Sequence, residues 1–392
     1  MTSPDYSVIV VHHRGREHLL EGLSALGEAV AGRGETILVD NTAGQPMEEV
    51  LRRHPGVRRV GAGGNAGFAG GCRLGAEAAR GPILIFVNDD AIVDREAPEL
   101  LAAALAGAPE DVTAVAGRLT DLSGEKNDFS DGFLTFDGHA FQSEVGRPIA
   151  CISDSVPGEE RLFACGGLMA ARRDAFLQAG FDEDYFAYLE DVDFGWRQWI
   201  AGRRIVAEPR AFARHRGGAT AQALGLFERG FLFERNAFAT AYKNFDADYF
   251  AAYMPAILAA FLGRVAEMLT ALNPAAAELQ RDPFRQPYSR RGVWRRLFGI
   301  GDRDGRIAVD DPLTVAQLKA LLWIHRNQQV LADKRRKVQQ ARRRTDAEIF
   351  GKFPLRIVAT YPGDERFDSD YFREFLQRAP HLARTTLQEI FS

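Results

Sequence analysis

Short apolar runs alternate with amphipathic stretches along the first part of the chain. Runs such as Tyr6–Val11 are apolar on both faces, whereas the stretches between them place apolar residues at helical spacing. The pattern predicts strands at Tyr6–Val11, Glu35–Asn41, Val57–Val60, Pro82–Asp94 and Val112–Ala116, separated by helices around Leu19–Leu26, at Met47–Arg53, up to Ala79 and at Ala97–Ala106. Because this alternation with short links is typical of a parallel sheet covered by helices, we expect an α/β fold.

The stretch Pro82–Asp94 is expected to be the central strand, because its apolar run is unbroken until Asn88, Asp89 and Asp90. Ligands of open α/β sheets bind at the carboxyl ends of the strands. Carboxylate oxygens at that edge suit a hard cation, so the motif predicts a Mg²⁺ or Mn²⁺ site that is bridged to a diphosphate. From this short motif alone, a solvated turn after a strand is an equally good interpretation.

A glycine-rich loop, GAGGNAGFAGG, follows the third predicted strand. Gly61–Ala66 formally matches the dinucleotide-binding fingerprint, but that motif belongs after a first strand and requires a later acidic residue that is missing here. The loop is better interpreted as backbone that approaches a nucleotide or sugar closely, with Asn65 as a polar contact. A purely structural loop explains the glycines comparably well.

A second group of acidic residues lies at the start of a helix predicted at Asp191–Ala201. The 3.6-residue spacing of apolar positions in this helix assigns Trp196 and Trp199 to the core. Acids at a helix N-terminus commonly complement the helix dipole, contributing about 0.3 to 1 kcal/mol. Three acids within four positions, beside several aromatic residues, exceed what capping requires: Glu190, Asp191 and Asp193.

The regular alternation stops after the fifth strand. Leu119–Glu160 lacks periodicity and predicts a long excursion of the kind that often carries function. The remaining pattern predicts a strand at Phe163–Ala171, a short helix at Arg172–Ala179, helical structure at Ala221–Asn273, a linker at Arg281–Asp311, a long helix at Thr314–Asp346 and two short helices within Asp368–Ile390. We therefore expect a catalytic α/β domain over residues 1–220 and a mainly helical region over residues 221–392.

Composition restricts the class of protein. A chain of 392 residues with 46% hydrophobic and 26% charged residues predicts a globular protein of about two or three domains. The three cysteines, Cys72, Cys151 and Cys165, form no CxxC pair, which favours a reducing compartment and disfavours structural zinc. The first apolar run is too short for a secretory signal peptide, so we expect a cytoplasmic protein.

The charge distribution is more informative than the net charge. A net charge of −4 gives no reason to expect a nucleic-acid partner. Arg281–Arg344 contains 17 Lys and Arg against 6 Asp and Glu, a net of +11, so the rest of the chain carries −15. This asymmetry predicts a basic face toward an anionic partner.

The uncharged run Tyr249–Gly263 is the most apolar part of the C-terminal region. It is 15 residues long and contains Pro255, which makes the run itself too short to span a bilayer. Packing against the catalytic domain is the expected arrangement. The alternative is an interfacial helix whose basic neighbours meet anionic lipid or a lipid diphosphate acceptor.

Several motifs together resemble the inverting glycosyltransferases of family 2, especially their rhamnosyltransferase-like branch. They are NAGFAGG, a strand ending in VNDD, and GGLMAARRDAF, GFDEDYFAYLEDVDFGWR and GRRIVAEPRAFARH, which follow in order between Tyr6 and Thr220. The resemblance implies a GT-A fold, a nucleotide-diphospho-sugar donor and a divalent cation, Mn²⁺ or Mg²⁺. It favours dTDP-rhamnose or a UDP-sugar as donor and a hydroxyl on a glycan or lipid-linked sugar as acceptor, in surface polysaccharide or glycoconjugate synthesis.

The resemblance also implies residue roles. Asp90 matches the acid of the DxD-like metal motif, and His215 matches a histidine that completes the metal site in some members. Asp191 matches the base of the family's ED motif, with Glu190 beside it. The remaining positions that it implies for the donor are Asp40, Asn65, Gly67, Arg73, Asn88 and Asp89.

The chemistry of these residue types agrees with the resemblance. A cation held by Asp90 stabilises a departing diphosphate, and Asp191 is a carboxylate that can take the proton of an incoming hydroxyl. One in-line step assisted by such a base inverts the anomeric centre.

Two departures limit the carry-over from the family. Arg73 stands where the branch usually has asparagine, which puts the donor in doubt. The QxxRW motif of processive synthases does not occur, so we expect transfer of one or a few sugars. Two other classes of protein stay open. The first is a nucleotide-sugar pyrophosphorylase-type enzyme, for which HHRGR loosely approximates the required phosphate loop. The second is a degenerate nucleotide-sugar-binding protein, which would be expected to lose Asp90 and Asp191.

Overall fold

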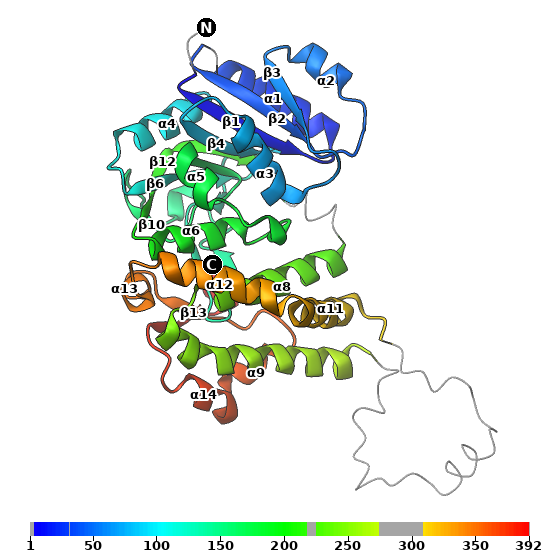
Figure 1. Cartoon of the computed structure of the whole chain (residues 1–392), viewed down its shortest axis with the longest axis vertical. Helices are drawn as coiled ribbons and strands as arrows, with labels where there is room; N and C mark the ends of the chain where they lie inside the picture. Colours follow the sequence, from blue (N-terminus) through cyan, green and yellow to red (C-terminus); the bar gives the residue numbers. More distant parts are fainter. Residues whose placement is uncertain (1–3, 31, 218–224, 274–308, 392) are drawn as a thin grey trace, which may run out of the picture.

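A computed structural model describes residues 4–30, 32–217, 225–273 and 309–391 of the chain (Figure 1). Within these residues, ten strands form one sheet in the order β10-β12-β6-β11-β4-β1-β2-β3, with β5 paired to β12 and β7 to β6. The strands are β1 (Tyr6–His12), β2 (Gly34–Asp40), β3 (Val57–Gly61), β4 (Ile83–Asn88), β5 (Ala91–Val93), β6 (Val112–Thr120), β7 (Asn127–Phe129), β10 (Glu160–Arg161), β11 (Leu168–Arg172) and β12 (Arg204–His215). The pairs of β1 with β2 and β4, of β2 with β3 and of β6 with β12 are parallel, whereas β11 is antiparallel to β4 and β6. The predicted α/β fold with a mostly parallel sheet is confirmed.

Helices cover the two faces of this sheet. They are α1 (Arg16–Ala29), α2 (Glu48–Arg53), α3 (Gly67–Ala78), α4 (Ala97–Gly107), α5 (Arg173–Ala179) and α6 (Glu190–Ile200). Val8 and Val10 of β1 pack in one buried cluster with residues of α1 and α4, while Ile9 and Val11 pack in another with residues of α3 and α5. This alternation along one strand is what a sheet buried on both faces requires.

The central strand is β4, as predicted. Every residue from Ile83 to Val87 is buried, and the strand lies between β1 and β11. The predicted strand Pro82–Asp94 is nevertheless two strands, because the chain turns at Asp89 and Asp90 before β5 begins. Acidic residues are costly to bury unpaired inside a sheet, so the turn at the sheet edge is the expected place for them.

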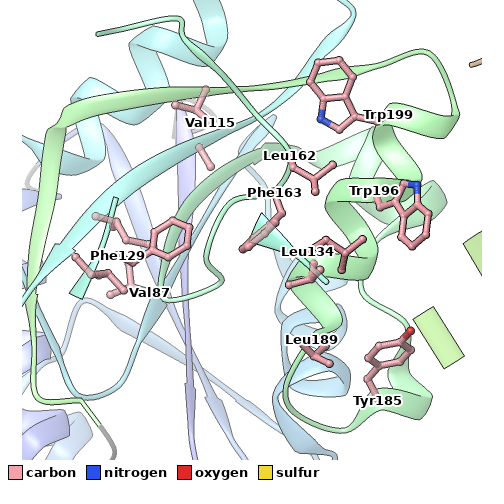
Figure 2. Packing of buried hydrophobic residues seen from close by; sticks show 14 of the residues in the cluster. Val87, Val115, Phe129, Leu134, Leu162, Phe163, Tyr185, Leu189, Trp196 and Trp199 are labelled. Atoms are coloured by element: carbon pink, nitrogen blue, oxygen red, sulfur yellow. The ribbon is translucent and has the colours of Figure 1, made fainter. Parts of the chain in front are cut away.

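Helix α6 contributes to the core the two tryptophans that were predicted to be buried (Figure 2). Trp196 is 0% and Trp199 is 3% exposed, which confirms their assignment to the core. Each indole N–H has a buried acceptor, because Trp196 donates to Asp346 Oδ1 at 3.1 Å and Trp199 to the Arg161 carbonyl at 2.9 Å. The first of these bonds ties α6 to the C-terminal part of the chain.

Three predicted elements differ from the structure. The strand expected at Phe163–Ala171 begins only at Leu168, because the preceding residues, which include two glycines, form a turn. The excursion over Leu119–Glu160 contains short strands, among them β8 (Gly132–Leu134) and β9 (Ala140–Gln142). The long helix expected at Thr314–Asp346 is broken at Asn327, whose side-chain amide donates to the Trp323 carbonyl and thereby competes with helical hydrogen bonding.

The C-terminal region is mainly helical and lies against one end of the sheet domain (Figure 1). Its elements are α8 (Leu226–Asn244), α9 (Ala247–Ala271), α11 (Pro312–Arg326), α12 (Gln328–Ala341), α13 (Asp346–Phe350), α14 (Asp370–Leu376) and α15 (Leu387–Phe391), with strands β13 (Leu355–Ile357) and β14 (Leu382–Arg384) and the single-turn helix η4 (Asp364–Asp368). The start of the predicted helical segment, 221–224, and most of the predicted linker, 281–308, lie outside the described residues.

Helix α9 is longer than the apolar run from which it was predicted. Among the described helices it alone is long and apolar enough to cross a membrane by length and composition, and half of its most apolar window is buried inside the protein. Core helices pass the same test. The buried half agrees with the expected packing, while Leu258 and Leu262 lie exposed on the other side.

A buried charge cluster joins α9 to three other segments. Arg264 of α9 bonds Asp364 of η4 at 2.6 Å and Asp137, beside the β8–β9 turn, at 2.8 Å. His139 lies 3.2 Å from both Asp137 and Glu234 of α8. Burial lowers the pKa of His139, but the two carboxylates outweigh burial and raise it to about 9, so the cluster holds two cations at neutral pH.

Candidate active site

Strand β4 ends at Asn88, and the turn after it carries Asp89 and Asp90 at the carboxyl edge of the sheet. Because β1 runs parallel to β4, its last residue, His12, reaches Asp89, and the two side chains meet at 2.7 Å between Nδ1 and Oδ2. Burial raises the pKa of Asp89, and the contact with His12 offsets only part of that rise. Asp89 is therefore engaged within the protein, whereas Asp90 faces a different partner.

Asp90 and His215 are neighbours although 125 positions separate them in sequence. Strand β5 pairs with the end of β12 so that Ala91 lies opposite His215, and Asp90 Oδ1 is 3.0 Å from His215 Nε2. The other ring nitrogen, Nδ1, is 2.7 Å from Oδ2 of Asp128 on β7. Burial lowers the pKa of His215, but Asp128 and Asp90 outweigh it and raise the pKa to about 10. Burial raises the pKa of Asp90, yet His215 brings it below its ordinary value.

Asp90 and His215 are of the residue types that could contribute to a divalent-cation site. A carboxylate on the far nitrogen, here Asp128, is the usual way in which a metal-binding histidine is oriented. No group of three or more His, Cys, Asp and Glu that could hold a metal occurs in the part of the chain that the structure describes. A cation here would take Asp90 and a deprotonated His215 from the protein and its other ligands from phosphate and water, as Mg²⁺ sites at nucleotides commonly do.

The glycine-rich loop lies beside the end of β2. Asn65 Oδ1 accepts the Gly67 N–H at 3.0 Å, and Asn65 Nδ2 is 3.3 Å from His13. Gly67 has a φ of +74°, and a Cβ added there would lie 2.3 Å from the Phe186 carbonyl oxygen. The loop therefore packs directly on the segment that leads into α6, which explains the need for glycine at this position.

Asp40 ends β2 and is 5% exposed. Its Oδ1 accepts from the backbone and hydroxyl of Thr42, and its Oδ2 accepts from Arg59 at 2.6 Å. Burial raises its pKa, but these bonds outweigh burial and hold the pKa below its ordinary value. The carboxylate is thus ionised and fixed at the same sheet edge as the β4 turn.

Glu190 and Asp191 open α6 immediately after an irregular turn. We call residues 185–189 the base-proximal turn; within it Phe186, Tyr188 and Leu189 all have positive φ. Asp191 is partly exposed, and its Oδ2 accepts the Gly166 N–H at 2.8 Å while Oδ1 accepts the Val192 N–H.

Gly166 and Gly167 link the two acidic groups. The carbonyl of Gly167 accepts the Asn88 N–H at 3.1 Å, while the neighbouring Gly166 binds Asp191. A Cβ at Gly167 would lie 3.1 Å from Asn88 Nδ2, and one at Gly166 would lie 2.9 Å from Phe68. The two halves of the candidate site therefore meet at a backbone link that leaves no room for side chains.

Burial governs the ionisation of the carboxylates at the start of α6. The sequence interpretation expects the helix start and nearby N–H groups to favour ionised Asp191; in the structure burial outweighs the Gly166 and Val192 N–H groups and raises its pKa. Burial and the charge of Asp191 raise the pKa of Glu190 still further above its ordinary value. One Glu190 oxygen, Oε2, is buried and has no hydrogen-bond partner among the residues that the structure describes.

Arg73 does not join the other predicted donor residues. Its guanidinium bonds Glu77 at 2.7 Å and the Leu177 carbonyl of α5, and it lines a groove of about 1250 Å³ between α5, α6 and α12. No described contact brings it to the β4 turn. The helical phase of α3 points this side chain away from the edge that Gly67 occupies.

Four residues of the candidate site were not predicted from the sequence: His12, Asp128, Gly166 and Gly167. His12 belongs to the HHRGR stretch; its ring contacts Asp89, and His13 Nδ1 lies 3.0 Å from the Asn41 carbonyl oxygen. Asp128 lies in the excursion whose length alone signals function. Gly166 and Gly167 stand in a stretch predicted to be strand, and a glycine pair inside such a stretch is the signal that could have located them.

In comparisons with known proteins, the first half of the chain is similar to glycosyltransferases. Residues 7–179 match the family model described as Glycosyl transferase family 2. A low-salt glycan biosynthesis hexosyltransferase, Agl10 of Haloferax volcanii, is 24% identical over 204 residues, which cover 49% of this chain and 61% of the relative. The chain thus spans less than two thirds of that relative.

Two solved structures align with this chain. GalNAc-T7 with UDP, GalNAc and Mn²⁺ aligns with a TM-score of 0.50 at 16% identity, over 66% of this chain and 51% of that chain. The mannosyltransferase PcManGT of Pyrobaculum calidifontis, in complex with GDP-Man and Mn²⁺, aligns with a TM-score of 0.44 at 17% identity, over 82% and 87%. The first likeness, together with the mostly parallel sheet and the helical C-terminal part, shows the GT-A type of fold predicted from the motifs.

Proposed function

We propose that this protein transfers a sugar, with inversion and with the help of a divalent cation, from a nucleotide-diphospho-sugar to a hydroxyl acceptor. The observation that carries the proposal is the link at Gly166 and Gly167, which joins Asp191 to the same sheet edge as Asp90 and His215. Displacement of a diphosphate by a hydroxyl needs a cation at the diphosphate and a base at the hydroxyl. Two side chains that could bind one cation and a separate carboxylate at the same sheet edge suit this reaction. The match over residues 7–179 supports the same class of reaction.

The donor is proposed to lie along the carboxyl edge of the sheet. Asp40 is placed at the nucleotide, with Asn65 and Gly67 as backbone-level contacts of the glycine-rich loop. Asn88 and Asp89 shape the turn that presents Asp90. Mn²⁺ or Mg²⁺ held by Asp90 and His215 would neutralise the diphosphate as it leaves. The resemblance to the rhamnosyltransferase-like branch favours dTDP-rhamnose or a UDP-sugar, while the Arg73 position departs from that branch.

Asp191 is proposed to act as the base in a single displacement. It takes the proton of the acceptor hydroxyl as the hydroxyl oxygen forms a bond to the anomeric carbon. The bond from that carbon to the diphosphate oxygen breaks, and the diphosphate leaves with the electron pair from the opposite face, which inverts the anomeric centre. Glu190 lies beside it, and burial raises the pKa of Glu190 well above its ordinary value, which favours its neutral form.

The acceptor is proposed to be a hydroxyl on a glycan or lipid-linked sugar, in the cytoplasm and in the synthesis of a surface polysaccharide or glycoconjugate. The excess of positive charge in the C-terminal half supports an anionic acceptor or surface. Protection from thermal unfolding by a panel of nucleotide sugars, with and without Mn²⁺, identifies the donor, because a ligand that binds the native state raises its stability. A pyrophosphorylase would instead form nucleotide sugar from a sugar phosphate and a nucleoside triphosphate.

Replacing Asp90 by alanine is expected to abolish the contribution of Mn²⁺ to nucleotide binding. The variant loses the carboxylate that would share the cation with His215 and the diphosphate. Calorimetric titration of a nucleoside diphosphate, with and without Mn²⁺, measures the effect. Asp94→Ala, at a partly exposed acid just after β5, is the control and should bind like the parent protein. An Asp90→Ala variant with unchanged Mn²⁺-dependent affinity would remove Asp90 from the site.

We also propose a peripheral contact with an anionic membrane, made on the C-terminal side. The net charge of +11 over Arg281–Arg344 and the exposed Leu258 and Leu262 of α9 support it. Two of the four basic residues on α12 are engaged inside the protein: Lys334 binds Asp182 and Asp184, and Arg335 donates to the carbonyl oxygen of Tyr242 on α8. The proposal therefore depends on the other basic residues of Arg281–Arg344 and on the leucines of α9.

Flotation with liposomes tests this contact. We expect binding to vesicles that contain anionic lipid at low salt and weaker binding at high salt, because each basic residue near such a surface contributes roughly 1 kcal/mol and salt screens it. Neutral vesicles are the control, and a Leu258→Glu and Leu262→Glu double variant should bind less. Absence of binding at low salt would leave the basic segment as a face for the acceptor alone.

A further inference from the structure

The base-proximal turn is held in a backbone conformation that its residues do not favour. Phe186, Tyr188 and Leu189 have φ values of 65°, 70° and 65°, in the region that favours glycine. Large side chains adopt it only where surrounding structure holds them there, and such residues gather at functional sites. Since Asp191 follows two positions after Leu189, whatever holds this turn also sets the position of the proposed base.

One side chain of α8 bonds most of the turn. Asn236 Nδ2 donates to the carbonyl oxygens of Tyr185, Ala187 and Tyr188 at 3.1, 2.9 and 2.7 Å. The Oδ1 of Asn236 accepts from Arg235 Nε at 2.8 Å, which fixes the orientation of the amide so that its N–H groups face the turn. Asn236 is 1% exposed, so water does not compete for these bonds.

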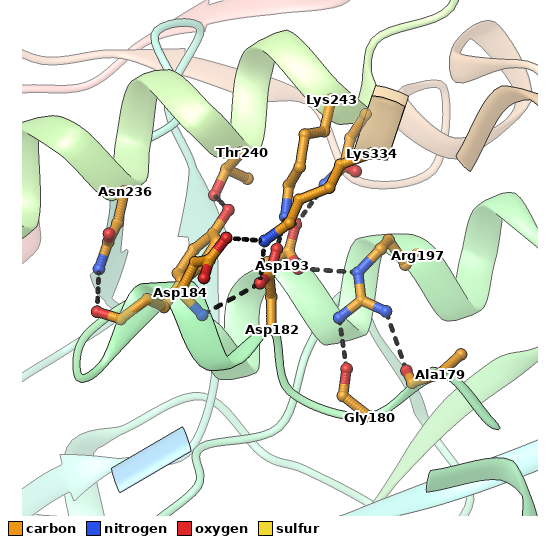
Figure 3. Close-up of polar contacts among 12 residues, drawn as sticks. Ala179, Gly180, Asp182, Asp184, Asp193, Arg197, Asn236, Thr240, Lys243 and Lys334 are labelled. Atoms are coloured by element: carbon orange, nitrogen blue, oxygen red, sulfur yellow. Dashed lines mark hydrogen bonds and ion pairs between the residues drawn. The ribbon is translucent and has the colours of Figure 1, made fainter. Parts of the chain in front are cut away.

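Other side chains of α8 bind Tyr185, the first residue of the turn, and acidic residues on either side of the turn (Figure 3). Thr240 lies 2.6 Å from the Tyr185 hydroxyl, and Lys243 binds Asp182 at 2.6 Å. Asn244 donates to Asp193 at 3.0 Å. None of the described contacts of α8 reaches Asp191 itself, whose carboxylate accepts only from Gly166 and Val192. Helix α8 can therefore act on the base only through the backbone that carries it.

We propose that Asn236 is a positioning residue for the transfer reaction: its side-chain amide holds the base-proximal turn, and thereby Asp191, in place. This role rests on the proposed function, in which Asp191 is the base. It assigns a part in the reaction to the RNAFATAYKN stretch of α8, which belongs to the C-terminal half of the chain. A displacement of the base by about 1 Å is enough to cost on the order of 100-fold in rate.

The first experiment needs no substrate. Amide hydrogen exchange over residues 185–193 is compared in the parent protein, Asn236→Ala and the milder Asn236→Ser, which keeps one donor. Asn273→Ala is the matched control, because Asn273 is also 1% exposed and bonds a helix carbonyl, that of Met268, but lies away from the turn. We expect exchange at 185–193 to rise about 10-fold or more in Asn236→Ala, less in Asn236→Ser and not in Asn273→Ala. Equal exchange in all four proteins would overturn the proposal.

The second experiment uses transfer kinetics. Asn236→Ala is expected to lower kcat by about 10- to 100-fold with little change in KM for the donor, and Asn236→Ser to lie between it and the parent. Because Asn236 acts through Asp191, adding Asn236→Ala to Asp191→Asn should cost almost nothing more. A full additional loss in the double variant, or an equal loss of kcat in Asn273→Ala, would show a general structural role instead. If hydrogen exchange responds as expected but the parent protein transfers no sugar, the proposed function is wrong, while the finding that Asn236 holds the base-proximal turn remains valid.

Discussion

Asp191→Asn is expected to reduce sugar transfer by about 10²- to 10⁴-fold, the usual contribution of a positioned general base. Asparagine preserves the size of the side chain and can still accept the Gly166 N–H, so the helix start should keep its geometry. What is lost is the capacity to take a proton. Donor affinity should survive, because the base serves the acceptor side of the reaction. Steady-state transfer rates and calorimetric donor binding, measured on the same preparation, separate the two effects.

Glu190→Gln is the matched control for this substitution. Burial and the charge of Asp191 raise the pKa of Glu190 well above its ordinary value, which favours the neutral form, and glutamine has nearly the same size as that form. We expect near-parent rates from this variant. If Asp191→Asn transfers sugar almost normally, or if Glu190→Gln loses as much activity as Asp191→Asn, then the base lies elsewhere.

Arg264→Met is expected to lower the free energy of unfolding by about 3 to 5 kcal/mol, because removing one member of a buried ion cluster leaves its partners buried without compensation. Arg264 is 3% exposed and binds Asp137 and Asp364, and Glu234 lies at 3.6 Å. Methionine fills a similar volume, so the loss reports the charge rather than a cavity. Urea unfolding followed by circular dichroism measures it.

An exposed arginine of the same region gives the comparison. Arg366 pairs with Glu267 of α9 at 2.7 Å, but its side chain is 61% exposed. Exposed pairs typically contribute about 0.2 to 1 kcal/mol, so Arg366→Met should cost no more than that. Similar losses in the two variants would mean that the buried cluster contributes little to stability beyond what a surface pair does.

The sequence pattern predicts the parts of the fold that depend on local residues. The strands between Tyr6 and Ala116, apart from the break at Asp89 and Asp90, and the helix that the structure begins at Glu190 follow from apolar periodicity. The contact of Asp90 with His215 does not, because it depends on the register between β5 and β12, two strands far apart in the chain. For the same reason Asp128, which reaches His215 through the β6–β7 pairing, has no local signal.

Arg73 and the basic run of α12 show a second limit. Composition shows that a basic side chain is present but not which side of its helix the side chain occupies. For Arg73 on α3, that side determines whether the guanidinium faces the proposed nucleotide-sugar donor or packs against α5. On α12 it determines that Lys334 binds Asp182 and Asp184 instead of facing solvent. Orientation of a long charged side chain becomes visible only once the elements on both sides are placed.

The dependence of the base-proximal turn on α8 has a consequence for how such a chain can be recombined. A fragment that ends at residue 220 keeps Asp90, Asp191 and His215 but releases the turn from Asn236. A hybrid of two related enzymes that joins them at that point would pair one parent's turn with the other parent's helix. Crossovers placed after Asn244 keep the turn and α8 from the same parent. The segment that must be exchanged as a whole is therefore longer than the stretch that contains Asp90, Asp191 and His215.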